Sequence, residues 1–349
     1  MLLNLVLAAP SDPSYGCAMT SSRLLGSLEV FPIALGCMGM SGMYGASDEN
    51  ESVATIQQAI DSGINLLDTG DFYGMGHNEM LIGRAIRGRR DNVLLSVKFG
   101  ALRGPDSAWL GVDARPAAVK NFLAYTLKRL NVDYIDIYRP ARLDPNVPIE
   151  ETVGAIAELV KAGYVRAIGL SEVGVDTIKR AHAVHPITDL QIEYSLISRS
   201  PERDIFPMLR QLGIGVTAYG VLSRGLLSGS LPQGKSDFRA HMPRFRDENL
   251  ARNQKLIDAL RDIAAAHNVT PTQLAIAWVM ARGETIVPVI GARTRAQLAE
   301  SLGALTIRLS SDDLTVIEQA VPAEAVAGTR YDERQMSALD SERPPNTPR

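Results

Sequence analysis

Residues 149–172 read IEETVGAIAELVKAGYVRAIGLSE and contain a complete helix-to-strand unit. From Ile149 onward apolar residues recur at helical spacing, and the glycine at position 163 marks the end expected of such a helix. The run VRAIGLS that follows, residues 165–171, is short and apolar, as is typical of a buried strand. These residues therefore predict one amphipathic helix packed against one strand.

The same alternation of apolar run, polar turn and amphipathic helix continues along the chain. Runs of this kind occupy residues 33–37, 64–68, 92–99, 134–139, 165–171, 190–195, 214–220 and 285–291. Strands that alternate with helices predict a parallel sheet, and eight repeats favour a single-domain α/β fold, the (β/α)8 TIM barrel. A doubly wound open sheet is the rival, but no GxGxxG follows the first run.

The two ends of the chain depart from this pattern. We expect residues 1–27 to be a flexible N-terminal extension, residues 28–339 to be the barrel, and residues 340–349 to be a disordered, Pro-rich tail. The first apolar run has no Lys or Arg before it and is too short to span a bilayer, which argues against a secretory signal. Met19 is an alternative start, which would make residues 1–18 a loose extension.

Composition indicates a soluble globular protein. Of the 349 residues, 46% are hydrophobic and 21% are charged, which suffices for a large core. A net charge of −3 without a basic stripe argues against a nucleic-acid partner. Cys17 and Cys37 are too few for a disulfide framework, so we expect a reducing, cytoplasmic setting and no structural zinc. The expected partner is a small molecule; nothing in the sequence indicates an oligomeric state.

Candidate catalytic residues stand at the ends of two runs, where barrel enzymes place their active sites. Asp68 ends the second run, Tyr73 follows in the next loop, and Lys98 lies near the end of the third run. An ammonium near a phenol should lower the tyrosine pKa, and a carboxylate should keep that lysine charged. Such a group suits protonation of an oxygen during hydride transfer to a carbonyl. Each residue alone also fits an ordinary role in a turn, in packing or in solvent.

Other strand ends carry groups that suit a nicotinamide. Ser171, Glu172 and Gln191 offer a hydroxyl, a carboxylate and an amide to a carboxamide group. Tyr219, at the end of the seventh run, offers a ring for stacking.

Two further loops carry groups that suit phosphates. The loop GVLSRGLLSG, residues 220–229, combines glycines with Ser223 and Arg224 beside a possible pyrophosphate. After the eighth run, Arg293 and Arg295 stand at a loop-to-helix junction that could grip a phosphate. An ordinary solvated helix start fits that second stretch equally well.

The sequence resembles the aldo-keto reductases from about Leu28 to Leu339. The motifs that carry the resemblance include GCMGMSGMYG, INLLDTGDFYG, GHNEMLIGRAI, SVKFG, LQIEYSL, AYGVLSRGLLSG and PVIGARTRAQLAES. The resemblance implies a (β/α)8 barrel that binds NADP(H) without a Rossmann domain. It also implies reduction of an aldehyde or ketone to an alcohol, or the reverse reaction on an alcohol, with Tyr73 as general acid/base assisted by Lys98 and Asp68.

The resemblance further implies the cofactor contacts. The residues concerned are Gly39, Met40, Asp68, Ser171, Glu172, Gln191, Tyr219, Gly220, Leu222, Ser223, Arg224, Gly225, Leu226, Ile290, Gly291, Arg293, Gln297, Glu300 and Ser301. Among them Arg293, which would meet the adenosine 2′-phosphate, favours NADPH over NADH. Ser301 and Ala292 are mild departures, because many members have asparagine and threonine there.

A larger departure concerns the fourth catalytic residue. Many members have a Tyr-Gln-His-Arg-like run before a shared Asp-Pro, and alignment on Asp144-Pro145 puts Ala141 in place of the histidine. Loss of one such donor slows a reaction roughly a hundred- to thousand-fold. Arg139, or a water admitted by the small side chain, is the expected substitute, and Arg142 and His77 are weaker candidates. The predicted substrate-site residues are Tyr73, Arg139, Ala141 and Arg142.

Two other functions stay open on the sequence alone. A nicotinamide-binding regulatory or sensor protein with weak or vestigial reductase activity would keep the cofactor residues and lack the histidine. A phosphate-binding barrel isomerase or aldolase could use Lys98 as a Schiff base, but would leave the dinucleotide motifs unexplained.

Overall fold

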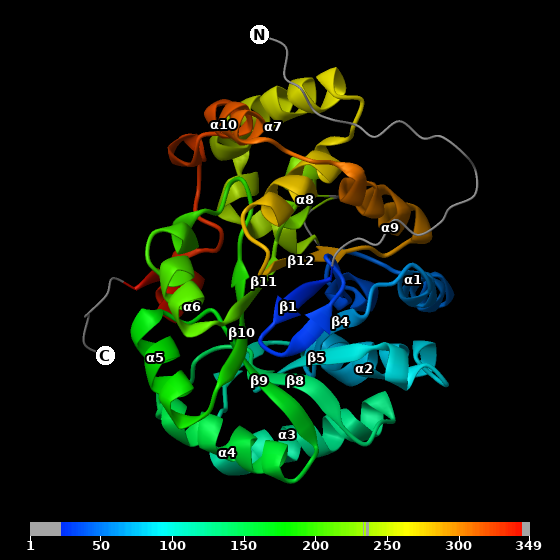
Figure 1. Cartoon of the computed structure of the whole chain (residues 1–349), viewed down its shortest axis with the longest axis vertical. Coiled ribbons are helices and arrows are strands. Elements are labelled where there is room, and N and C mark those ends of the chain that lie inside the picture. The colour runs from blue at the N-terminus through cyan, green and yellow to red at the C-terminus, as the bar shows by residue number, and fades with distance from the viewer. Residues whose placement is uncertain (1–21, 233, 235–236, 344–349) are drawn as a thin grey trace.

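A closed barrel of parallel strands forms the centre of the chain in this computed structural model, which describes residues 22–232, 234 and 237–343 (Figure 1). Its staves are β3 (Ala34–Gly36), β4 (Leu66–Gly70), β5 (Leu94–Phe99), β8 (Ile135–Pro140), β9 (Val165–Ser171), β10 (Ile187–Glu193), β11 (Gly215–Tyr219) and β12 (Ile286–Gly291). Pairing of β12 with β3 closes the ring. The predicted (β/α)8 barrel is therefore confirmed.

Helices cover the outside of this barrel (Figure 1). They are α1 (Glu49–Asp61), α2 (His77–Ala85), α3 (Pro116–Leu130), α4 (Ile149–Lys161), α5 (Val175–Val184), α6 (Ile205–Leu212), α7 (Asp247–Ala266), α8 (Pro271–Ala281), α9 (Arg295–Leu302), α10 (Ser311–Ala320) and α11 (Glu333–Ser337). Polar side chains fix several starts; the Asp48 carboxylate, for example, accepts from the Glu51 N–H of α1. The helix read from residues 149–172 is α4, and the strand after it is β9.

The sixth strand begins three residues earlier than predicted. Asp189 looks unsuited to a buried strand, because an unpaired charge is costly to bury. In the structure its carboxylate accepts hydrogen bonds from Arg139 on β8 (2.9 Å) and Thr217 on β11 (2.6 Å). Partners on β8 and β11 thus let β10 begin at Ile187, before this acid.

An antiparallel hairpin of β1 (Arg23–Leu25) and β2 (Leu28–Val30) adds to the barrel near the N-terminal ends of its strands. Leu25 is fully buried, and a Cβ on Gly215 of β11 would lie 2.5 Å from its side chain. Glycine there thus admits Leu25 into the small cluster with Ala34, Leu66 and Val287.

Both predicted domain boundaries differ from the described structure. The boundary after residue 27 falls inside this hairpin, because burial of Leu25 ties residues 23–27 to the barrel. At the other end, residues 340–342 form a short 3-10 helix, and the Asp340 carboxylate accepts from the Gly174 N–H at 2.9 Å. The remainder of the predicted extension and tail, residues 1–21 and 344–349, lies outside the described residues. In the part of the chain that the structure describes, no helix combines the length and apolar character needed to cross a bilayer.

Replacing Leu25 by alanine should lower the free energy of unfolding by about 2–5 kcal/mol, because it removes a fully buried side chain and leaves a cavity. The matched control is Leu24→Ala, because Leu24 is 56% exposed and should change stability by less than about 0.5 kcal/mol. Urea unfolding followed by circular dichroism measures both. Equal, small effects would show that the hairpin does not contribute to the fold.

Candidate active site

A buried ion pair lies at the C-terminal ends of β4 and β5. The two strands pair in parallel, with Asp68 opposite Ser96 and Gly70 opposite Lys98. Lys98 Nζ donates to Asp68 Oδ2 at 2.5 Å, and both side chains are at least nine-tenths buried. The other carboxylate oxygen accepts from Ser96 Oγ (2.9 Å) and from Gln191 Nε2 on β10 (2.8 Å). The structure thus brings the predicted acid and lysine together.

Tyr73 lies beside this pair. It begins the short 3-10 helix Tyr73–Gly76 that follows β4, and it is 7% exposed. Lys98 Nζ lies 5.2 Å from the centroid of the Tyr73 ring. Edge contact with the Phe72 ring, at 4.8 Å between centroids, fixes the phenol from the other side. The three predicted catalytic residues therefore form one cluster.

The pKa of Tyr73 moves opposite to the direction predicted from the sequence. Burial and the nearby Asp68 carboxylate raise the pKa of the phenol above its usual value, while Arg142 opposes them. Burial also lowers the pKa of Lys98, although the Asp68 charge works against this. The reason is that desolvation disfavours both the phenolate and the ammonium, and Asp68 already balances the lysine charge. Tyr73 is accordingly a neutral phenol, the form that donates a proton.

Arg139, predicted at the substrate site, is instead a fully buried part of the barrel interior. Its guanidinium donates to Asp189 (2.9 Å), Thr217 (3.1 Å) and Ser96 (2.9 Å). These partners lie on three other barrel strands, β10, β11 and β5. They therefore hold the Arg139 guanidinium inside the barrel. Arg139 is therefore not a free donor for a substrate, and that prediction is wrong.

The residues after β8 lie closer to Tyr73. The Ala141 N–H donates to the carbonyl oxygen of Phe99 at 2.8 Å, and the side chain is 2% exposed. Arg142 is half-buried, and its Nη1 donates to the Ala141 carbonyl oxygen at 2.7 Å. The positive charge of Arg142 acts on Tyr73, Lys98 and Tyr219. The charge of Arg142, predicted as a weaker candidate for the substitute donor, thus acts on the cluster around Tyr73.

His77 is engaged away from the Lys98–Asp68 pair. Its two ring nitrogens lie 2.9 Å from Ser41 Oγ and 3.0 Å from Glu49 Oε1. These contacts attach the start of α2 to Ser41 and to the first residue of α1, so both ring nitrogens of His77 are engaged away from Lys98 and Asp68.

The groups predicted around the nicotinamide lie at the ends of β9, β10 and β11. Ser171 Oγ is buried and has no hydrogen-bond partner among the described residues. Gln191 holds Asp68 through its amide nitrogen. The Glu172 carboxylate, by contrast, accepts from Tyr219 Oη (2.8 Å) and from Arg330 (2.6 and 2.9 Å). Glu172 is thus already engaged by the protein.

The loop after β11 has an unusual backbone. Ser223, Arg224 and Gly225 all have positive φ, of 46°, 58° and 93°. The Ser223 N–H donates to the Gly220 carbonyl oxygen (2.7 Å) and the Gly225 N–H to the Leu222 carbonyl oxygen (2.9 Å), so these groups bond within the loop. Arg224 itself donates to Glu193 at 3.1 Å and lies over the Tyr331 ring at 4.6 Å. The predicted pyrophosphate loop is therefore a tight turn, and its Arg224 side chain pairs with Glu193.

The predicted adenosine-phosphate residues lie around the start of α9. Arg293 Nη1 donates to the carbonyl oxygen of Tyr44 at 3.0 Å, and its N–H donates to Gln297 Oε1 at 2.9 Å. Arg295 pairs with Glu51 at 2.9 Å. Ser301 Oγ donates to the Gln297 carbonyl oxygen within the helix at 2.9 Å. Of the two arginines, only Arg293 contacts the loop after β3.

The remaining predicted cofactor residues lie on the segments that follow these same strands. Gly39 and Met40 lie in the 3-10 helix after β3; Gly220 and Leu222 follow β11; Leu226 lies in the 3-10 helix Ser223–Ser228; Ile290 and Gly291 end β12; Glu300 lies in α9. The segments after β3 and β12 lie close together at Gly39. A Cβ added to this glycine would lie 3.3 Å from the Arg293 side chain and 3.4 Å from the Tyr44 side chain.

Several residues around the site carried no recognised signal in the sequence. Burial and the nearby Glu79 raise the pKa of Asp71, which lies between β4 and Tyr73, to about 7. Arg330 and Tyr331 come from the segment after α10, and Tyr331 Oη lies 3.1 Å from Tyr219 Oη. Only the fold brings Arg330 and Tyr331 to the strand ends, so no local pattern marks them.

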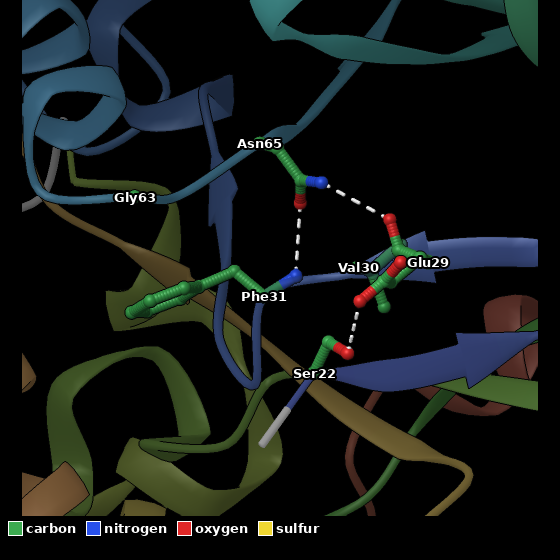
Figure 2. A pocket seen from close by; sticks show the side chains of 6 residues that line it. All are labelled: Ser22, Glu29, Val30, Phe31, Gly63 and Asn65. Carbon is green, nitrogen blue, oxygen red and sulfur yellow. Dashed lines mark hydrogen bonds between the residues drawn. The ribbon is translucent and has the colours of Figure 1, made fainter. Parts of the chain in front are cut away.

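An open pocket lies elsewhere, where the N-terminal hairpin meets the barrel (Figure 2). Asn65, just before β4, accepts from the Phe31 N–H (2.9 Å) and donates to the Glu29 carbonyl oxygen (3.0 Å). Figure 2 shows these bonds together with the one from Ser22 to Glu29. Because these contacts attach the hairpin at the N-terminal strand ends, the pocket is not the candidate active site. No group of three or more His, Cys, Asp or Glu residues arranged to hold a metal ion occurs among the described residues.

Comparison with known proteins agrees with this arrangement. A model of the aldo/keto reductase family matches residues 32–322. The chain is 43% identical over 312 residues to a probable aldo-keto reductase 1 from Glycine max, covering 87% of this chain and 89% of that protein. It is 37% identical over 335 residues to the Schizosaccharomyces pombe protein named aldo-keto reductase yakc (NADP(+)), covering 93% and 98%.

A solved structure has the same fold. A glycerol dehydrogenase from Gluconobacter oxydans matches with a TM-score of 0.79 over 95% of this chain and 100% of its own, at 24% identity. The family model covers most of the barrel, and both named relatives match along most of their length. The resemblance noted in the sequence is therefore confirmed, and this chain belongs to the aldo/keto reductase family.

Proposed function

We propose that this oxidoreductase uses NADP(H) to reduce an aldehyde or ketone to an alcohol, and that it can also run in reverse. The observation that carries the proposal is the cluster of Tyr73, Lys98 and Asp68 at the C-terminal strand ends. A neutral phenol beside a buried ammonium is a suitable proton donor to a carbonyl oxygen. The NADP(+) in the name of the yakc relative supports the choice of cofactor.

The residues at the site fit such a cofactor. Ser171 Oγ is a buried oxygen without a partner in the described part of the chain, as expected of a group that waits for a ligand. The Arg224 charge in the loop after β11 supports a pyrophosphate site, and Arg293 supports a 2′-phosphate site. Tyr219 offers its ring to the nicotinamide. When bound, NADPH would supply the hydride.

Each side chain of the cluster has its own role in proton transfer. Tyr73 Oη donates its proton to the carbonyl oxygen as that oxygen gains negative charge. Lys98 stabilises the phenolate that remains, and Asp68 holds the lysine in place at 2.5 Å. In the reverse direction the phenolate accepts the proton from an alcohol.

Arg142 supplies the second donor in this proposal, in place of the missing histidine. It lies one residue beyond Ala141, is half-buried, and directs its charge at Tyr73. A guanidinium keeps its charge at any physiological pH and carries five N–H donors. The bond from Nη1 to the Ala141 carbonyl oxygen uses one of them. An arginine can thus polarise the carbonyl that a histidine polarises in relatives.

A second candidate function is a nicotinamide-binding regulatory or sensor protein with weak or vestigial reductase activity. Ala141 favours this alternative, because alanine has no donor for the carbonyl oxygen. The two functions differ in turnover and agree in cofactor binding.

Replacement of Tyr73 by phenylalanine should lower turnover of aldehydes and ketones by at least roughly a hundredfold, because it removes the proton donor. The dissociation constant for NADPH should change little. The assay follows the loss of NADPH absorbance with a panel of aldehydes, ketones and quinones, and the control is the exposed Tyr125→Phe. Full activity in Tyr73→Phe would contradict the assignment, and tight NADPH binding without wild-type turnover would favour the sensor.

Replacement of Arg142 by methionine should lower kcat roughly a hundred- to thousand-fold and leave NADPH binding nearly unchanged, because one donor to the developing oxyanion is lost. Adding Ala141→His to that variant should restore a large part of the rate. The same Ala141→His substitution in the wild type should give a smaller gain, because the two groups would serve one oxygen. Equal gains in both backgrounds, or an unchanged kcat in Arg142→Met, would exclude Arg142 as the donor.

A further inference from the structure

Glu172 carries a buried carboxylate at the nicotinamide end of the site. It follows β9 in a left-handed conformation, with φ 54°, and is 1% exposed. Its oxygens accept from Tyr219 Oη (2.8 Å), the Glu193 N–H (2.9 Å), Ser341 Oγ (2.6 Å) and both terminal nitrogens of Arg330 (2.6 and 2.9 Å). Burial raises the pKa of Glu172, but the charges of Arg330 and Arg142 and the hydrogen bonds from Arg330 and Ser341 together lower it to about 2. The carboxylate is therefore ionised at any physiological pH.

Arg330 supplies the direct ion pair that balances this charge. Its guanidinium meets Glu172 through two parallel hydrogen bonds, the strong geometry of arginine with a carboxylate. It also donates to Glu342 at 2.7 Å. The neighbouring acid, Glu193, lies 3.8 Å from Arg330 but also has Arg224 at 3.1 Å and Arg244 at 3.4 Å, so it keeps two partners without Arg330. Removal of Arg330 would thus leave Glu172 without its ion-pair partner.

The segment that supplies Arg330 also contacts other predicted cofactor residues. Tyr331 Oη lies 3.1 Å from Tyr219 Oη, and the Tyr331 ring lies 4.6 Å from the Arg224 guanidinium carbon. Ser341, near the end of the described chain, adds a second hydroxyl to Glu172. Residues 330–341 therefore form one wall beside the residues assigned to the nicotinamide and pyrophosphate.

We propose that the Arg330–Glu172 pair sets how strongly the site prefers reduced over oxidised cofactor, an inference that rests on the proposed function. The nicotinamide ring is positive when oxidised and neutral when reduced. An unpaired carboxylate at this position attracts the positive ring, whereas the bidentate arginine cancels that attraction. Arg330 is a positioning residue that acts through Glu172, and the pair favours binding of NADPH.

The test measures dissociation constants for NADPH and NADP+ separately, by cofactor fluorescence and by calorimetry. Arg330→Met should shift the ratio of the two constants toward NADP+ on the order of tenfold, because a nearby buried charge loses its counter-charge. Glu172→Gln should shift the ratio toward NADPH, because the arginine charge is then unbalanced. The double variant Arg330→Met/Glu172→Gln should return close to the wild-type ratio.

Two further variants separate charge from structure. Arg330→Lys keeps the positive charge and should keep the ratio of the two dissociation constants. Loss of the two parallel hydrogen bonds to Glu172 should affect only thermal stability. Arg199→Met removes a half-buried arginine that pairs with Glu202 and Glu318, and should leave the ratio unchanged.

The outcomes distinguish this proposal from the proposed function. Equal weakening of both cofactor forms in Arg330→Met, with no recovery in the double variant, would show that the pair only supports the C-terminal segment. A wild-type ratio in Arg330→Met would also overturn the proposal. Failure of the wild type to bind either cofactor form would overturn the proposed function and this inference together.

Discussion

The ion pair between Lys98 and Asp68 is the interaction on which the active-site architecture depends. Two charges are held inside a barrel, where neither would be tolerated without its partner. Parallel pairing of β4 with β5 fixes the register that places them together. Every other feature of the catalytic cluster is arranged around this pair: Tyr73 lies beside the ammonium, and Gln191 reaches across from β10 to the carboxylate.

A chain of polar contacts supports the pair from within the barrel. Arg139 donates to Ser96 Oγ at 2.9 Å, and Ser96 Oγ donates to Asp68 at 2.9 Å. Asp189 in turn balances the charge of Arg139 at 2.9 Å. Arg139 thus supports the Asp68 carboxylate through Ser96 from within the barrel. Arg142, one residue past Ala141, lies beyond the end of β8, and its charge acts on Tyr73.

The sequence predicts local features of this protein well and long-range ones poorly. Strand and helix periodicity locates the barrel, and strand-end position locates Asp68 and Lys98, because both depend on neighbouring residues. The role of Arg330 depends on Glu172, 158 residues earlier, and only folding creates that contact. Burial of Leu25 and the raised pKa of Tyr73 arise in the same way, from surroundings that several distant segments assemble.

The most direct measurement is a crystal structure of the chain with NADP+ bound. We expect the nicotinamide ring against Tyr219, on the side of the barrel opening where Tyr73 and Lys98 lie. The carboxamide should reach the buried Ser171 hydroxyl, and the pyrophosphate should lie in the loop that follows β11. A dinucleotide bound away from these strand ends, or a Tyr73 hydroxyl that faces away from the nicotinamide, would contradict the assignment of this cluster to hydride-transfer chemistry.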